Sequence, residues 1–327
     1  MNTGRHGEGV PPPPPKARQK TRLSRSLLRR AVSSVGLVIL ILTWAPAIAS
    51  EPATGKEPWT DRTLTPDARA DLLESAMTVA EKVQLVHGSM PLLMKNRPAD
   101  VIGSAYVPGI PRLGIPALRE TDASLGVAAA ADHVEATALP SGLAIASSWD
   151  PDIAYSGGAM VGGEAAKKGF NVLLGGGVNL ARDPRCGRNF EYLGEDPLLA
   201  GTLGGQAIRG AQDEGIISTV KHFAINDQET GRRVLDAQID PAALRESDLL
   251  AFEIAIERGE PGSVMCSYNK VNGSYACANP DLLQRTLKAD WRYPGWIMSD
   301  WGAVRDAKAA VEAGLDQQSG EELDKMF

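Results

Sequence analysis

The sequence predicts an α/β fold of the (β/α)8 TIM-barrel type, in which parallel strands form a barrel inside a ring of helices. From Ile115 onward, short apolar segments alternate with helical segments, a pattern that is typical of a parallel sheet. Eight strand candidates favour a closed barrel over an open, doubly wound sheet. The run Gly175–Gly177 lacks the spacing and the helix start of a dinucleotide-binding loop, which also argues against the open sheet.

The strand candidates share a short apolar core between turn residues: 117–119, 143–146, 171–174, 217–220, 263–267, 296–299, 314–317 and, more weakly, 234–237. The helix candidates between them are 152–168, 198–214, 241–258, 280–290 and 303–313. The helix after the last strand is only begun by 321–327. We therefore expect residues 115–327 to form a C-terminally truncated barrel with its last helix incomplete.

Residues 50–114 are expected to form a lead with two helices. Thr65 and Pro66 are a typical N-cap and first helical residue, and Thr78 with Glu81 forms a capping box for the second helix. Both helices are expected to bury an apolar stripe, made of Leu72, Leu73, Val83, Leu85 and Val86. The segment 89–114, rich in Pro and Gly, is expected to be a loop.

Residues 1–49 have the pattern of a secretory signal peptide behind a basic leader. Arg22–Arg30 is positively charged, Val35–Trp44 is apolar, and Ala47-Ile48-Ala49 is a small-x-small cleavage signal. An uncleaved anchor is the alternative, because residues 31–49 carry no charge, but Pro46 and the cleavage motif favour removal. We expect cleavage after Ala49, a secreted or periplasmic protein, and no stable membrane span.

The charge distribution indicates the kind of ligand. Of the 327 residues, 43% are hydrophobic and 23% charged, which is ordinary for a globular protein. Residues 1–30 carry eight Lys/Arg and one Glu, so the remainder of a chain with net charge −6 carries −13. The strongly negative charge of residues 31–327 argues against nucleic acid as a partner and suits a neutral ligand.

Cysteine and histidine positions indicate no metal centre and no cofactor. The four histidines, at 6, 87, 133 and 222, are scattered, and Cys186 has no obvious metal partner. Cys266 and Cys277 bracket the polar segment Tyr268–Tyr275, which resembles a hairpin or loop. In an oxidising compartment they can pair across it, and two ordinary thiols are the alternative.

The candidate catalytic residue is Asp300. It follows the strand candidate 296–299 directly, and α/β barrels place their chemistry at the C-terminal ends of strands. The neighbouring Trp301 offers a flat apolar face on which a sugar ring can stack. The alternative interpretation is that Asp300 simply caps the helix that follows.

Five more polar residues lie on the C-terminal side of a strand candidate: Asp122, Arg188, Lys221, His222 and Tyr268. Taken singly, these residues have ordinary alternatives. Asp122 can be a turn residue, Arg188 an ion-pair partner of Glu191 or Glu195, His222 a core histidine, and Tyr268 a packing aromatic. Six such residues on one rim favour a single binding site. Carboxylate acceptors, cationic donors and aromatic faces together suit a neutral polyol.

Four segments resemble glycoside hydrolase family 3, in its β-glucosidase branch: 182–191 (RDPRCGRNFE), 221–223 (KHF), 263–269 (SVMCSYN) and 298–301 (MSDW). The resemblance covers roughly 75–320. It implies a (β/α)8 barrel and hydrolysis of terminal non-reducing β-D-glucosyl residues from β-glucosides or short β-glucans. It also implies a retaining mechanism with Asp300 as nucleophile. A sugar would be held by Asp122, Arg188, Lys221, His222 and Tyr268, with Trp301 stacked on its ring.

A retaining glycosidase needs two carboxyl groups about 5–5.5 Å apart, a nucleophile and an acid/base. Asp300 has to be ionised, and we expect the nearby charges of Lys221 and Arg188 to hold its pKa down. The resemblance places the acid/base Glu on a second domain after the barrel, whereas this sequence ends at Phe327. The histidine acid of the other family branch is absent, because residues 224–226 read Ala-Ile-Asn.

The sequence also departs from the family where Asp-Gly-Pro usually follows the first strand, since it reads Asp122-Ala123-Ser124 and so keeps the carboxylate but changes the turn. The chain therefore reads as the nucleophile half of a β-glucosidase, a truncated form that would lack its acid when alone. A non-catalytic sugar-binding fragment is one alternative. A Schiff-base aldolase using Lys221 is another, which the Asp300-Trp301 pair disfavours.

Overall fold

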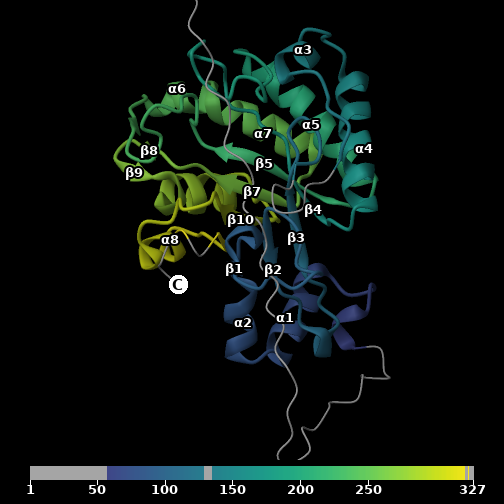
Figure 1. The fold of residues 1–327 in the computed structure, drawn as a ribbon. Helices are drawn as coiled ribbons and strands as arrows, with labels where there is room; N and C mark the ends of the chain where they lie inside the picture. The colour runs from purple at the N-terminus through teal and green to yellow at the C-terminus, as the bar shows by residue number, and fades with distance from the viewer. Residues whose placement is uncertain (1–56, 129–134, 321–322, 324–327) are drawn as a thin grey trace, which may run out of the picture. The chain divides into compact units, whose positions relative to one another are not determined.

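The structure is a computed structural model that describes residues 57–128, 135–320 and 323 (Figure 1). The described residues belong to one compact unit, Ser50–Phe327. The predicted signal peptide lies outside the described residues. None of the helices in the described part of the chain is both long and apolar enough to cross a membrane.

A six-stranded sheet organises the unit, with strands in the order β10-β7-β5-β4-β3-β2. Its members are β2 (Ala105–Val107), β3 (Leu118–Asp122), β4 (Val172–Leu174), β5 (Ile217–Phe223), β7 (Ser263–Cys266) and β10 (Trp296–Ser299). All neighbours are parallel except β2 and β3, which are antiparallel. The C-terminal ends of β3, β4, β5, β7 and β10 therefore share one edge, where a functional site is expected.

Two smaller sheets complete the strand arrangement: β1 (His87–Gly88) with β11 (Gln318–Ser319), and β6 (Asp236–Ala237) with the hairpin β8 (Lys270–Val271) and β9 (Ser274–Tyr275). Single bridges join the first of these to the edges of the large sheet. Met298 of β10 bridges to Gln317, and Ser89 bridges to Tyr106 of β2. The strand ladder thus continues from one edge of the curled sheet toward the other.

The predicted barrel-like α/β fold is confirmed, but the complete eightfold β/α repeat is not shown. Strand β2 runs antiparallel to β3, and only the 3₁₀ turns η2 (Pro91–Leu93) and η3 (Pro111–Leu113) separate β1, β2 and β3. Without a crossover helix, successive strands cannot all be parallel.

The α-helices are α1 (Pro66–Ala76), α2 (Val79–Leu85), α3 (Gly142–Ala146), α4 (Pro151–Lys167), α5 (Pro197–Asp213), α6 (Pro241–Glu246), α7 (Asp248–Gly259) and α8 (Ala307–Glu312). Three further segments have other helical geometry: the 3₁₀ turns η1 (Pro58–Thr60) and η4 (Ala276–Ala278) and the π-helix η5 (Asp281–Asp290). Helix α5 packs between α4 and α7 (Figure 1). The contact with α4 is close, since a Cβ on Gly158 would meet the backbone oxygen of Ala207 at 1.9 Å.

The two faces of the strands bury different clusters, because successive side chains point to opposite sides. Val220, Val264 and Ile297 belong to the large core that includes Phe252 of α7. Val172, Leu174, Met265 and Met298 form a second cluster from β4, β7 and β10, with Trp301 packed against it. Strands β4, β7 and β10 are therefore covered on both faces, which explains why their sequences are mostly apolar.

Several predicted elements need correction. Segment 143–146 is helix α3, not a strand, because Ser141 caps it and a short apolar run does not distinguish the two. The helix predicted for 303–313 begins only at Ala307, and 241–258 is divided between α6 and α7 at Ser247. Strands β1 and β2 were missed, since two or three residues carry too little periodicity to be recognised.

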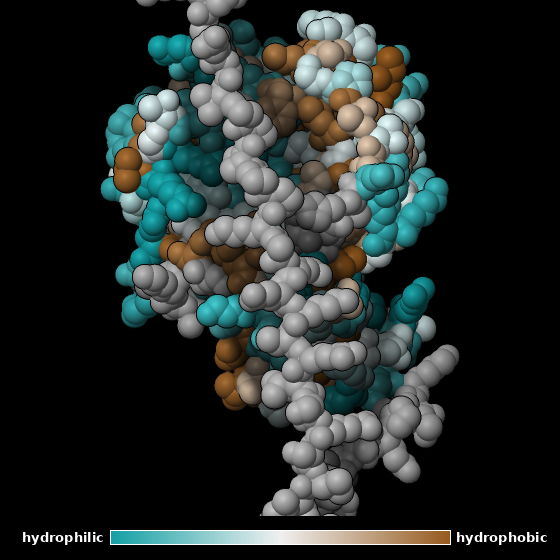
Figure 2. All heavy atoms as spheres, in the orientation of Figure 1, coloured by the Kyte–Doolittle hydropathy of each residue, from teal (hydrophilic) through white to brown (hydrophobic). Residues whose placement is uncertain are grey.

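The caps predicted for α1 and α2 are present. The Thr65 side chain accepts from Ala68, and Thr78 and Glu81 form both bonds of a capping box. The predicted burial is wrong in part, because the exposed fraction is 40% for Leu72 and 48% for Val83. Figure 2 shows hydrophobic residues at the surface over α2, as well as over α3.

Candidate active site

Asp300 is the first residue after β10 and is held by two donors on the same oxygen. The Tyr268 hydroxyl and the Trp301 backbone N–H each donate to its Oδ1, both at 2.7 Å. The side chain does not cap the next helix, since Asp306 caps α8. The capping interpretation of Asp300 is therefore wrong, and its carboxylate is instead part of a buried polar cluster.

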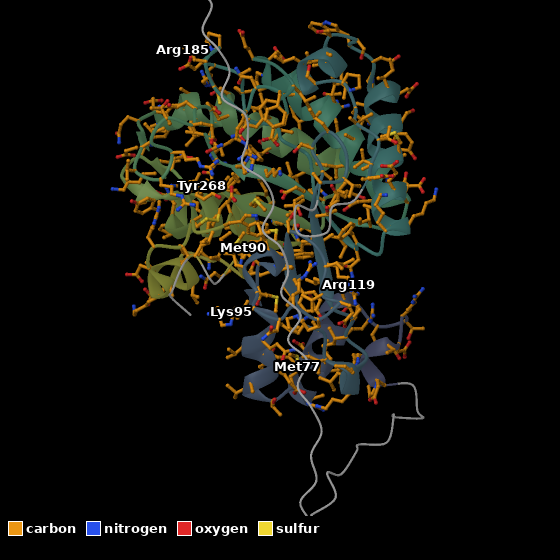
Figure 3. The ribbon with its side chains drawn as sticks, in the orientation of Figure 1. Met77, Met90, Lys95, Arg119, Arg185 and Tyr268 are labelled. Atoms are coloured by element: carbon orange, nitrogen blue, oxygen red, sulfur yellow. A yellow bond between two sulfur atoms is a disulfide. The ribbon has the colours of Figure 1, made fainter. Side chains whose placement is uncertain are left out.

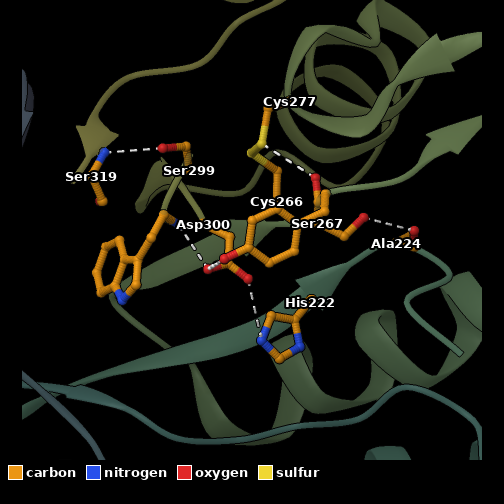
Figure 4. The surroundings of a disulfide bond; sticks show 10 residues. His222, Ala224, Cys266, Ser267, Cys277, Ser299, Asp300 and Ser319 are labelled. Atoms are coloured by element: carbon orange, nitrogen blue, oxygen red, sulfur yellow. Dashed lines mark hydrogen bonds and ion pairs between the residues drawn. A yellow bond between two sulfur atoms is a disulfide. The ribbon is translucent and has the colours of Figure 1, made fainter. Parts of the chain in front are cut away.

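His222 lies on the other side of the same carboxylate (Figure 4). Its Nε2 is 3.7 Å from Asp300 Oδ2, which is too long for a hydrogen bond. Burial, together with the positive charges of Arg188, Lys221 and Arg232, holds the pKa of His222 well below its ordinary value. His222 is therefore neutral near pH 7 and does not form an ion pair with Asp300.

The charge state of Asp300 depends on opposing effects. Burial raises the pKa of Asp300 above its ordinary value, and the Tyr268 hydroxyl, the Arg188 charge, the Trp301 amide and the Lys221 charge all act to lower it. The expectation that the two cations hold this pKa down is thus wrong in its net direction. Both cations act as expected, but the sequence does not reveal how completely the carboxylate is withdrawn from water.

A second polar cluster lies around Lys221, at the end of β5. Its Nζ is 3.9 Å from Asp122 Oδ1 and 4.0 Å from Glu191 Oε2. Arg188 Nε donates to Glu191 Oε1 at 2.5 Å, and the Ser124 hydroxyl donates to Oε2 of the same residue. Burial raises the pKa of Glu191, but the charges and hydrogen bonds around it prevail and hold it below its ordinary value. Glu191 is therefore an anion that organises two cations.

A cavity of about 430 Å³ opens beside this second cluster. Its wall includes the charged residues Asp122, Arg188, Glu191 and Lys221 together with mostly apolar residues, among them Phe190. Asp122 is the most accessible of the charged set, with 47% of its side chain exposed. It accepts a hydrogen bond from the Ser104 hydroxyl at 2.7 Å.

The structure thus arranges the seven predicted site residues in two neighbouring groups. Asp122, Arg188 and Lys221 line the cavity, whereas Asp300, His222, Tyr268 and Trp301 do not. The groups are linked because Lys221 precedes His222 on β5 and because Arg188 and Asp300 interact electrostatically. Trp301 is partly buried against the cluster of Val172, Leu174, Met265 and Met298.

Three contributors were not singled out from the sequence: Glu191, Ser104 and Arg232. Glu191 was considered only as an ion-pair partner of Arg188, which it is. Glu191 also lies close to Lys221. Because the two residues are thirty positions apart in the sequence, no local sequence pattern indicates this contact. Arg232 stacks its guanidinium 4.2 Å from the centre of the Tyr268 ring, a cation–π contact between two loops.

The segment that carries Tyr268 is a hairpin closed by a disulfide. Strands β8 and β9 pair around Asn272 and Gly273, both with positive φ. Cys266 and Cys277 are bonded, with Cα atoms 5.2 Å apart. Of the two possibilities that the sequence left open for these cysteines, the structure has the disulfide. Figure 3 shows Tyr268 between this hairpin and β7.

Within residues 57–128, 135–320 and 323, no group of three or more His, Cys, Asp and Glu side chains is arranged to hold a metal ion. The described site itself is composed of carboxylates, a neutral imidazole, a phenol and the cations Arg188 and Lys221.

Comparison with known proteins identifies the family. Residues 106–319 match the model of the Glycosyl hydrolase family 3 N terminal domain. The chain belongs to this family. It is 41% identical over 216 residues to thermostable beta-glucosidase B of Acetivibrio thermocellus, an alignment that covers 63% of this chain and 29% of that protein. It is 39% identical over 221 residues to an exo-alpha-(1->6)-L-arabinopyranosidase of Bifidobacterium longum, which covers 64% and 29%.

Solved beta-glucosidase structures share the fold. Beta-glucosidase 3B from Thermotoga neapolitana in complex with glucose aligns with TM-score 0.73 and 36% identity, over 78% of this chain and 37% of that one. DesR, a beta-glucosidase from Streptomyces venezuelae in complex with D-glucose, aligns with TM-score 0.72 and 38% identity, over 77% and 31%. The chain thus spans about a third of the length of these relatives.

Proposed function

We propose that this chain supplies the nucleophile and the glycone-binding pocket of a retaining β-glucosidase, with Asp300 as the nucleophile. The observation that carries the proposal is the position of the Asp300 carboxylate. It follows β10 on the functional edge of the sheet, and its hydrogen bonds from Tyr268 and Trp301 both fall on one oxygen. The family membership and the glucose complexes of two relatives support a glucoside as substrate.

The hydrogen bonds indicate which oxygen attacks. Oδ1 accepts from Tyr268 and from the Trp301 amide, whereas Oδ2 accepts no hydrogen bond from a described residue. In the proposed step, Oδ2 forms a bond to C1 of the sugar while the bond from C1 to the leaving oxygen breaks, and the acid gives its proton to that oxygen. The deprotonated acid then takes a proton from water as the water oxygen bonds to C1, and the bond from C1 to Asp300 Oδ2 breaks. Tyr268 and Trp301 keep the carboxylate oriented through both steps.

The cavity residues are proposed to bind the hydroxyl groups of the glucosyl unit. Asp122 is an acceptor that reaches the cavity, and Lys221 and Arg188 are donors that the buried anion Glu191 holds in place. Hydrogen bonds that the sugar hydroxyl groups donate to the Asp122 carboxylate should strengthen as positive charge develops on the sugar in the transition state. His222 and Trp301 complete the proposed pocket on the side of Asp300.

The general acid is proposed to be a Glu of a C-terminal domain outside this chain. Glu191 is a poor acid, because its lowered pKa keeps it ionised at neutral pH. Glu229 is engaged by Arg232, whose Nη1 donates to it at 2.6 Å. The chain covers about a third of the length of its relatives, which is consistent with a further domain.

Covalent trapping tests the nucleophile. A 2-deoxy-2-fluoro-β-glucoside with a dinitrophenolate leaving group needs little protonation, so Asp300 should attack it slowly without the acid. We expect one equivalent of phenolate and a labelled peptide that contains Asp300. Asp300→Asn should abolish the label, and the matched control Asp306→Asn, outside the site, should keep it. A label on Glu191 or another carboxylate would show that the nucleophile is misassigned.

Glucose binding tests the pocket separately. Asp122→Ala and Lys221→Ala should each remove glucose binding measured by calorimetry, provided that circular dichroism shows an unchanged fold. The control Lys308→Ala removes an exposed lysine that pairs with Glu312 and should leave the affinity unchanged. Unchanged affinity in both site variants contradicts the pocket. Binding without any trapping would instead favour a sugar-binding fragment.

We also propose that the strand ladder closes into a barrel, in which β1 and β2 of the lead 50–114 join the strands of 115–327. The bridges from Met298 to Gln317 and from Ser89 to Tyr106 support closure. Export with removal of residues 1–49 remains our proposal for the N-terminus, on the basis of its sequence pattern.

A further inference from the structure

The disulfide lies against the residues that hold the candidate nucleophile (Figure 4). Cys266 is the last residue of β7, and its carbonyl oxygen accepts from the Asp300 backbone N–H at 3.2 Å. Cys277 Sγ is 3.5 Å from the Ser267 carbonyl oxygen. Both cysteines are fully buried. The bond therefore joins the end of β7, where Asp300 is anchored, to the returning end of the hairpin.

Tyr268 lies inside the loop that this bond closes. On one side, Ser267 and Asn269 are tied to the end of β5, because Ser267 Oγ and Asn269 Nδ2 both donate to the Ala224 carbonyl oxygen. On the other side, the Ala276 N–H donates to the Asn269 carbonyl oxygen at 2.9 Å, one residue before Cys277. The backbone on either side of Tyr268 is thus held by β5 and by the disulfide-bonded return of the hairpin.

We propose that the Cys266–Cys277 disulfide is a positioning device for Tyr268, which keeps the phenol hydroxyl on Asp300 Oδ1. The geometry gives the bond this role because it fixes both ends of the segment that carries the phenol. The part of the inference that calls Asp300 a nucleophile rests on the function proposed above. The coupling between the disulfide and the Tyr268–Asp300 hydrogen bond does not.

The coupling has a measurable electrostatic consequence. The Tyr268 hydroxyl, the Arg188 and Lys221 charges and the Trp301 amide all stabilise the ionised form of Asp300, and neutral His222 faces its second oxygen. Loss of the Tyr268 hydrogen bond should therefore raise the pKa of Asp300, because that bond favours the carboxylate. A hydrogen bond to a charged group corresponds to a shift of about one pH unit.

The experiment measures the Asp300 titration by NMR of protein labelled with ¹³C at the aspartate carboxyl carbon. The Asp300 signal is assigned by its loss in Asp300→Asn. Tyr268→Phe should raise the Asp300 midpoint by about one pH unit. The double variant Cys266→Ser/Cys277→Ser should also raise the Asp300 midpoint. Combining the double variant with Tyr268→Phe should give no further rise, because in a double-mutant cycle changes that act through the same hydrogen bond are not additive.

Two controls keep the test decisive. Cys186→Ser removes the remaining, unpaired cysteine and should leave the Asp300 midpoint unchanged. If the double serine variant does not fold, phosphine reduction of the folded Cys186→Ser protein gives the same comparison. A lower melting temperature with an unchanged midpoint would show that the disulfide is only a structural brace. A rise that persists in the Tyr268→Phe background would show that it acts on Asp300 by another route.

The readout also separates this inference from the proposed function. Failure of the fluoroglucoside to label Asp300 contradicts the function but leaves the NMR cycle valid. Labelling of Asp300 together with an unchanged midpoint in the cysteine variant supports the function and overturns the positioning role. In protein that does label, the pH midpoint of the trapping rate should move upward with the NMR midpoint, while that of Cys186→Ser stays in place.

Discussion

Glu120 is a carboxyl group whose burial should make stability fall as pH rises. It lies in the middle of β3, fully buried, two residues before Asp122. Gln317 Nε2 donates to its Oε1 at 3.0 Å, and its Oε2 has no hydrogen-bond partner among the described residues. Burial raises the pKa of Glu120 from 4.5 to about 7, against the hydrogen bond from Gln317 and with help from the Asp122 charge.

The magnitude follows from the difference between the folded and unfolded pKa values. Below pH 4.5 the carboxyl is protonated in both states, so its stabilising contribution is fully present. As pH rises through the folded pKa of about 7, this contribution is lost, because the unfolded chain ionises first. The full loss is about 3 kcal/mol, since one pKa unit corresponds to about 1.4 kcal/mol. Glu120→Gln cannot ionise and should escape it.

Urea unfolding at pH 4, 5.5, 7 and 8 provides the assay. The stability of Glu120→Gln minus that of the wild type should rise by about 3 kcal/mol between pH 4 and pH 8, whatever the constant cost of the amide. Glu312→Gln, an exposed control, should show a much smaller change. A difference that stays flat across this range would mean that Glu120 is ionised in the folded protein and that our account of its burial is incorrect.

Three further outcomes are expected. Glu191→Gln leaves the Arg188 charge buried without its partner, so stability should fall by about 3–5 kcal/mol in urea unfolding, and unchanged stability would contradict the ion-pair cluster. Arg182→Ala leaves the buried carboxylate of Asp248, 2.7 Å from Arg182 Nη2, unpaired. It should lower the stability measured by urea unfolding, and unchanged stability would contradict this ion pair. Protein recovered from an exporting host should begin at Ser50 by N-terminal sequencing, whereas a retained leader would contradict cleavage.

The sequence was most informative where one short segment carries the whole signal. Strand 296–299 was predicted with its observed bounds, because an apolar, β-prone run lies between turn residues. The caps at Thr65 and Thr78 were recognised because a cap requires only residues within one helical turn. The family was recognisable for a similar reason, since four short motifs in a fixed order carry the resemblance. Three of these motifs include the C-terminal end of a parallel strand, that of β5, β7 or β10.

The sequence failed where the answer depends on partners distant along the chain. Segment 143–146 looked like a strand but is helix α3, because a short apolar run fits both until its packing is known. The antiparallel β2 depends on three pairings with β3, which no local pattern announces. The exposure of Leu72 and Val83 likewise depends on which other segments of the protein pack against them.

The electrostatics of the candidate site were decided by tertiary structure alone. The residue types and the strand ends told us that Asp300, Lys221 and Arg188 would lie on one edge, and that they would interact. Only the folded protein shows that Glu191 takes up much of the cationic charge and that Asp300 is withdrawn from water, so that burial raises its pKa instead of lowering it. The burial of a carboxyl group depends on every segment that packs around it in the folded protein. The sequence alone does not show which segments these are.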